Sequence, residues 1–219
     1  MKTDKRVFKF AAWAGMMNLV LMPFVFIQLS GWMTKTLQGL ASVTALVMTY
    51  GFYRLAEDTK NKLLKKACIA MIIVGILFTV VGLTANMEFE LGEGIAFNPP
   101  SLTGFALYVL GLIALSITGI VFGAALMRIK LKLSKPAGIL EITSGLGWLM
   151  TALSLGSHIL RNDAFLSILP EAIGKIALVL GLIVFIPALL AQLPALLIAA
   201  GTAIASAILQ IIILLRLSR

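Results

Sequence analysis

The segment from Leu102 to Met127 reads LTGFALYVLGLIALSITGIVFGAALM and contains no charged side chain. The hydrocarbon core of a bilayer is about 30 Å thick, and a helix needs roughly 20 apolar residues to cross it. Six further apolar stretches come near the same length: Phe10–Leu29, Leu37–Tyr53, Ala67–Ala85, Ala137–Ser157, Ile173–Leu190 and Ala195–Leu215. The sequence therefore predicts an all-α integral membrane protein with seven transmembrane helices, built as successive helical hairpins.

The composition agrees with this class. Hydrophobic residues make up 60% of the chain and charged residues 12%, whereas soluble domains contain about 25% charged residues. The spans use nearly the whole chain, so we expect a single transmembrane domain, 1–219, without a soluble module. The one cysteine, Cys68, lies inside a span and offers neither an intramolecular disulfide nor a zinc site.

The basic residues indicate the topology. Most of the 18 Lys and Arg residues lie in three clusters, from Lys2 to Lys9, from Arg54 to Lys66 and from Arg128 to Lys135. If every span crosses, these clusters share one side, and the acidic segment Asn86–Ser101 lies on the other. The positive-inside rule then predicts a cell-membrane protein with a cytoplasmic N-terminus. The net charge of +9 fits contact with anionic lipid headgroups, so we expect no nucleic-acid partner.

The C-terminal third allows two topologies. From Ile173 to Leu215 the chain is mostly apolar, and it is interrupted near Pro187 and Pro194, where the missing backbone donors favour a turn. Two crossings give seven spans and an external C-terminus. Alternatively, residues 173–191 form a re-entrant or interfacial hairpin, which leaves six full spans and a cytoplasmic C-terminus. The seven-span topology is favoured because a re-entrant backbone must be buried in protein or line a cavity.

Small residues mark the expected helix contacts. Gly119 and Gly123 form a GxxxG pattern, and Ala199 and Ala203 lie on one stripe of the last span. Such residues allow two helix backbones to approach closely. Packing within the bundle is the favoured interpretation, and a homo-oligomer or another protein partner is the alternative.

Glu141 is the only acidic residue inside a predicted span. Intramembrane carboxylates are costly, and they often serve ion or proton pathways. The alternative is a carboxylate near the surface that pairs with Lys132 or Lys135, or extends to water. Asn18 occupies the matching position in the first span, where it could form a polar gate or a hydrogen bond that joins two helices.

His158, the only histidine, lies at the outer end of the fifth span, close to Asp163. A histidine can act as a general acid or base, but no partnered Ser or Cys nucleophile is apparent nearby. A polar loop at the membrane interface is the favoured interpretation. No cofactor or metal site is expected, because Glu88, Glu90 and Glu93 supply fewer ordered oxygens than a calcium loop needs.

Two classes of function remain. The first is a small transporter or channel-like protein, or an accessory subunit of a membrane assembly. The second is a membrane-embedded enzyme that acts on lipid through Glu141 or His158. An enzyme needs several polar groups in one cavity, and these two residues lie toward opposite sides of the membrane, so the first class is favoured. A transporter should gather Glu141, Asn18 and Thr143 around a cavity, whereas a subunit should have tightly packed helices.

Overall fold

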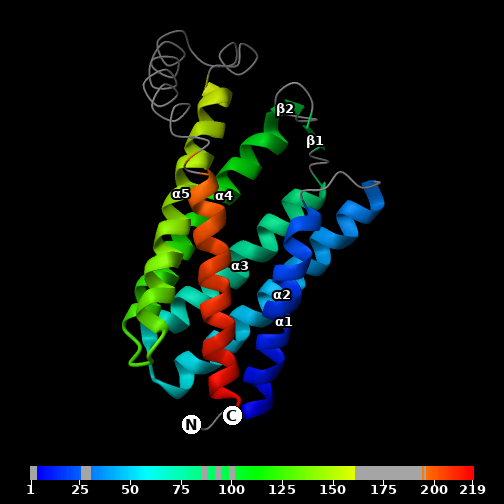
Figure 1. Ribbon diagram of the computed structural model, residues 1–219. Helices are drawn as coiled ribbons and strands as arrows, with labels where there is room; N and C mark the ends of the chain where they lie inside the picture. The colour runs from blue at the N-terminus through cyan, green and yellow to red at the C-terminus, as the bar shows by residue number, and fades with distance from the viewer. Residues whose placement is uncertain are drawn as a thin grey trace.

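The structure is a computed structural model, and it describes residues 4–25, 31–84, 88–91, 95–98, 102–160, 194 and 196–219. Within this part the chain forms six helices (Figure 1): α1 (Lys5–Val25), α2 (Gly31–Asp58), α3 (Lys62–Thr84), α4 (Leu102–Met127), α5 (Ser134–Leu160) and a C-terminal helix (Leu196–Leu217). Between α3 and α4 lie the short strands β1 (Glu88–Leu91) and β2 (Ile95–Asn98). The predicted helical bundle is confirmed.

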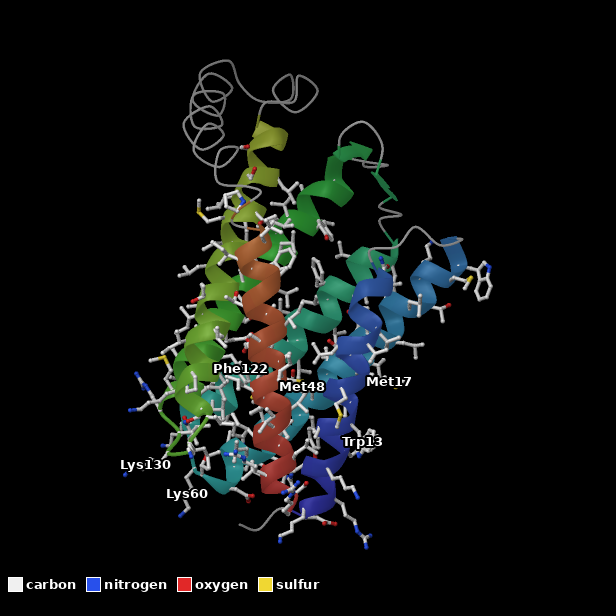
Figure 2. The ribbon with its side chains drawn as sticks, in the orientation of Figure 1. Trp13, Met17, Met48, Lys60, Phe122 and Lys130 are labelled. Carbon is white, nitrogen blue, oxygen red and sulfur yellow. The ribbon has the colours of Figure 1, made fainter. Side chains whose placement is uncertain are left out.

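Four of the described helices are long and apolar enough to cross a membrane, namely α3, α4, α5 and the C-terminal helix. The ends of α4 coincide with those of the predicted span, because Arg128 directly follows its apolar run. Large apolar side chains such as Trp13 and Met17 of α1 are exposed on the outside of the bundle (Figure 2). An apolar outer surface of this kind suits contact with lipid.

The helices pack as antiparallel neighbours in chain order, from α1 through α5. The C-terminal helix packs against both α5 and α1, since its Ser206 Oγ lies 3.2 Å from the Ala137 carbonyl oxygen and its Ile211 contacts Gly15. Lys5 Nζ donates to the Arg219 carbonyl at 2.6 Å. Both termini therefore lie at one end of the bundle (Figure 1). We call this the basic end, because it also carries the α2–α3 turn (residues 59–61) and the α4–α5 turn (residues 128–133).

The seven-span prediction is not confirmed. An odd number of full crossings would place the two termini at opposite ends of the bundle. The termini share one end, as the six-span alternative requires. The predicted span Ile173–Leu190 lies outside the described residues.

The turn between α2 and α3 is tightly hydrogen-bonded. Lys60 has a φ of 53°, the left-handed conformation that ends many helices. The backbone N–H of Lys60 donates to the Glu57 carbonyl, and that of Asn61 donates to the Ala56 carbonyl. The Asn61 side chain then accepts from the backbone N–H of Leu64 at 3.1 Å and caps α3. These bonds allow the chain to reverse within three residues.

The acidic segment between α3 and α4 contains a short β-hairpin that the sequence did not predict. β1 and β2 pair in antiparallel register, with Glu88 opposite Asn98 and Leu91 opposite Ile95. The order Glu, Phe, Glu, Leu in β1 alternates polar and apolar residues, which is the period of a strand. We did not predict these strands, because the glutamates make the segment polar overall.

The main cluster of buried apolar side chains, which we call the apolar core, lies in the half of the bundle nearest the basic end. It is built from all six helices, with contributions from Phe8, Ala11, Ala12, Phe52, Leu55, Leu64, Ala67, Cys68, Phe122, Leu126, Ala137, Ile211 and Leu214. Phe52 of α2 meets Phe122 of α4 edge to face, with their ring centroids 5.4 Å apart. This core holds the six helices together at one end.

Helices α4 and α5 approach each other through glycines. A methyl group at Gly123 would lie 2.7 Å from the Gly138 carbonyl oxygen, and one at Gly145 would lie 3.0 Å from the Ser116 carbonyl oxygen. No side chain fits at either position without a shift of backbone. The two helix backbones are therefore in direct contact over several turns.

The topology can be tested with single cysteines in a Cys68→Ala background. Cysteines at Lys62 and Arg219 should react with a membrane-impermeant thiol reagent from the same side, and a cysteine at Glu90 should react from the opposite side. Labelling of intact cells and of inverted vesicles measures the side. Opposite accessibility of positions 62 and 219 would contradict the shared end.

The glycine contact predicts a difference between two matched substitutions. Gly123→Ala should destabilise the bundle by about 1–3 kcal/mol, because the added methyl group forces the α4 and α5 backbones apart. Gly82→Ala in α3 meets no atom within 4 Å, so it should leave stability unchanged or raise it by about 0.5–1 kcal/mol. Unfolding in mixed micelles measures both effects, and equal stabilities would refute the contact.

Candidate functional site

Glu141 lies in the second turn of α5, at the interface with α4 and the C-terminal helix. Its Oε2 accepts a hydrogen bond from Ser206 Oγ at 2.7 Å and another from Gln210 Nε2 at 2.9 Å. Gln210 Nε2 also lies 2.9 Å from Ser206 Oγ and donates to it. We call Glu141, Ser206 and Gln210 the carboxylate cluster. It joins two helices that are far apart in the sequence.

Small residues make room for the carboxylate cluster. A methyl group at Gly119 of α4 would lie 3.7 Å from Glu141 Oε1, so a larger side chain there would press on the carboxylate. Further from the basic end, Ser144 of α5 donates to the carbonyl of the fully buried Ala199 at 3.2 Å. Ala203 lies between these two contacts and is half-buried. The small residues thus bring the helices close enough for direct hydrogen bonds.

Glu141 does not pair with the basic α4–α5 turn in the described part of the chain. Lys132 and Lys135 are exposed, and the described ion pairs join Glu57 to Arg54 and to Lys65. The alternative in which Glu141 is neutralised by a neighbouring lysine therefore has no contact to support it.

Asn18 has partners of its own. Its Nδ2 donates to the Ala41 carbonyl at 2.6 Å and lies 3.2 Å from Thr44 Oγ1. It therefore links α1 to α2, and the structure does not bring it together with Glu141. Thr143 likewise bonds within its own helix, to the Ile139 carbonyl at 3.0 Å.

His158 lies in the last turn of α5, and its side chain is outside the described part. It follows Glu141 by 17 positions on one helix, which corresponds to about 25 Å at 1.5 Å per residue. The two candidate acid–base residues therefore cannot act on one bond. Among the described residues, no three His, Cys, Asp or Glu side chains gather as metal ligands.

Neither Ser206 nor Gln210 was predicted from the sequence as a functional residue. The available signal was the spacing: Ser206 and Gln210 are four residues apart in an otherwise apolar span, so they lie on one helix face. A polar pair on one face of a membrane helix indicates a hydrogen-bonded interface.

The basic end carries a separate set of charges. Lys65 Nζ donates to Glu57 Oε1 at 2.9 Å, and Arg54 Nη1 donates to Oε2 at 2.7 Å. The hydrogen bond from Lys65 lowers the pKa of Glu57 below its ordinary value. A hollow of about 570 Å³ lies between the two turns, and its lining includes Arg128 and Lys130. Figure 2 shows Lys60 and Lys130 extending from this end.

Comparison of the chain with protein-family models, with curated proteins and with solved structures finds no match. The function must therefore be inferred from the arrangement of the residues.

The hydrogen bonds of the carboxylate cluster predict how the bundle responds to substitution. Glu141→Leu should destabilise it by about 1–2 kcal/mol, because Ser206 and Gln210 lose an acceptor. Glu141→Gln keeps a carbonyl oxygen as the acceptor and should cost less than about 1 kcal/mol. Thr143→Val, which changes only a bond within α5, serves as the control. Unfolding in mixed micelles measures all three, and a Glu141→Leu protein as stable as the wild type would refute the cluster.

Proposed function

We propose that the protein is a small transporter or channel-like protein of the cell membrane, closed at its basic end in this conformation. The proposed topology has six crossings, with both termini in the cytoplasm, where anionic lipid headgroups contact the basic residues. The observation that carries the proposal is a group of buried hydroxyl side chains that lies beyond Glu141, on the side away from the apolar core.

The half nearest the basic end is closed by the apolar core. Beyond Glu141, the buried side chains include hydroxyl groups: Ser144, Thr151, Ser154 and Ser157 on α5, and Ser116 on α4. Ionisable residues inside membrane spans mark solute and ion paths, and these hydroxyl groups lie on the far side of Glu141 from the apolar core. A path that leads from the far end to Glu141 and stops at the apolar core fits this arrangement.

One hydroxyl supports this interpretation directly. Thr151 and Ser157 donate to carbonyls of α5 itself. Ser154 Oγ is buried and has no hydrogen-bond partner in the described part of the protein. Buried hydroxyls in folded proteins are nearly always satisfied by protein or by ordered water. Ser154 is therefore suited to bind water or a passing solute.

A second candidate function is an accessory subunit of a membrane assembly. It is favoured by one observation, namely that Glu141, Asn18 and Thr143 each have separate partners and do not meet at a common cavity. In that case the carboxylate cluster only locks the C-terminal helix onto α5. An enzyme that acts on lipid is less well supported, given the distance between Glu141 and His158.

The transport proposal is tested in vesicles that contain anionic lipid. Gradients of H⁺, Na⁺ and K⁺ are imposed separately, and their decay is followed with ion-sensitive dyes. The wild-type protein should dissipate at least one gradient faster than protein-free vesicles do. Glu141→Gln should slow that flux at least tenfold, roughly the effect of losing a charged group worth about 1.4 kcal/mol in a barrier.

The matched control is Glu57→Gln, which removes an equivalent carboxylate at the exposed basic end. It should leave the flux unchanged. If the wild-type protein passes none of the three ions, the accessory-subunit function replaces the transport proposal. Equal losses in the two variants would show that Glu141 has no special role.

A further inference from the structure

The carbonyl oxygen of Ala137 also belongs to the hydrogen-bond network of the carboxylate cluster. Ser206 Oγ lies 2.7 Å from Glu141 Oε2 and 3.2 Å from the Ala137 carbonyl oxygen. A hydroxyl group has a single hydrogen to donate. Ser206 can therefore serve only one of these two oxygens at a time, and the choice depends on whether Glu141 carries a proton.

With an ionised Glu141, the Ser206 hydroxyl donates to Oε2, and Gln210 Nε2 directs one N–H between Oε2 and Ser206 Oγ, each 2.9 Å away. With a protonated Glu141, the new O–H group donates to Ser206 Oγ over the same 2.7 Å. Ser206 then rotates its hydrogen to the Ala137 carbonyl. In both states the Ser206 hydroxyl and the carboxyl group keep hydrogen-bond partners with the heavy atoms in the same places.

We propose that the carboxylate cluster is a binding site for one exchangeable proton. On release, the proton passes from Glu141 Oε2 to water, and the Ser206 hydroxyl turns from Ala137 to the carboxylate. If the protein is a transporter as proposed, this proton is either the transported ion or the ion that is coupled to the solute. This part of the inference rests on the proposed function.

The chemistry of the cluster favours a proton over a metal ion. The groups that face Glu141 are Ser206 and Gln210 of the C-terminal helix and Gly119 of α4. Gln210 presents N–H donors to the two oxygens, whereas an alkali or alkaline-earth cation needs oxygen ligands. No charged side chain of the described part forms an ion pair with Glu141. The charge of the carboxylate is thus balanced by proton uptake and not by a neighbouring cation.

The position of the cluster gives the direction of exchange. Phe122, Leu126 and Leu214 of the apolar core lie between Glu141 and the basic end. On the other side, Ser144 lies one turn further along α5, and Ser154, with its unpartnered hydroxyl, lies beyond it. In this conformation the proton exchanges toward the far end of the bundle.

The experiment is an infrared titration of the full chain in lipid vesicles, in which the carbonyl stretch of a protonated carboxyl group is followed against pH. The wild-type protein should show one titrating carboxyl band that is absent from Glu141→Gln. Ser206→Ala keeps the carboxyl group but removes its hydroxyl partner, so it should move the titration midpoint by about one pH unit. Thr143→Val is the control, and its midpoint should equal that of the wild type.

Each outcome decides the proposal. A titrating band that is lost in Glu141→Gln and shifted in Ser206→Ala supports the proton site. Identical titrations of wild type and Glu141→Gln overturn it, and so does a wild-type spectrum that responds to added Na⁺ at constant pH. A titrating Glu141 in a protein that passes no ion supports the proton site while refuting the transport function. Ion flux without a titrating carboxyl band would support the transport function while refuting the proton site.

Discussion

The arrangement of the described helices depends on one constraint, which is the placement of a half-buried carboxyl group in a membrane-spanning helix, with no ion pair among the described residues. Water is scarce there, so the carboxyl group must find its hydrogen bonds within the protein. Glu141 finds them on the C-terminal helix, at Ser206 and Gln210. These bonds specify which face of the C-terminal helix packs against α5, and with it the register of the two helices.

The glycines of α4 and α5 are the second condition for the cluster. Hydrophobic side chains cannot drive helices together within lipid, so close packing and hydrogen bonds must do so. The contact between Gly123 and Gly138 brings the two backbones together. Gly119, one turn away, faces Glu141, and a methyl group there would lie at an ordinary contact distance of 3.7 Å from Oε1. Of the two glycines of the GxxxG pattern, Gly123 is therefore the one that the close approach of the helices requires.

The two ends of the bundle have different physical characters. At the basic end, all six helices share an apolar core, and the surrounding Lys and Arg residues suit an anionic membrane surface. Away from it, the buried part of α5 carries hydroxyl groups. In the proposed function, Glu141 would be reached from the side of these hydroxyl groups and not through the apolar core. This asymmetry links the fold to the proposed function.

The sequence by itself determined the membrane class, the bounds of α4 and the position of Glu141 within a span, because these follow from the length and polarity of local segments. It also indicated that the basic clusters share one end, since consecutive spans alternate in direction. Only the tertiary structure decided that Glu141 faces Ser206 and Gln210, and that Asn18 bonds to α2 instead. Those pairings join residues more than 60 positions apart in the case of Glu141, and small-residue faces on several helices were equally compatible with other neighbours. The number of crossings was ambiguous for the same reason, because apolar length shows only that a segment can enter a membrane. The contact of Lys5 with Arg219 shows that the two termini lie at one end of the bundle.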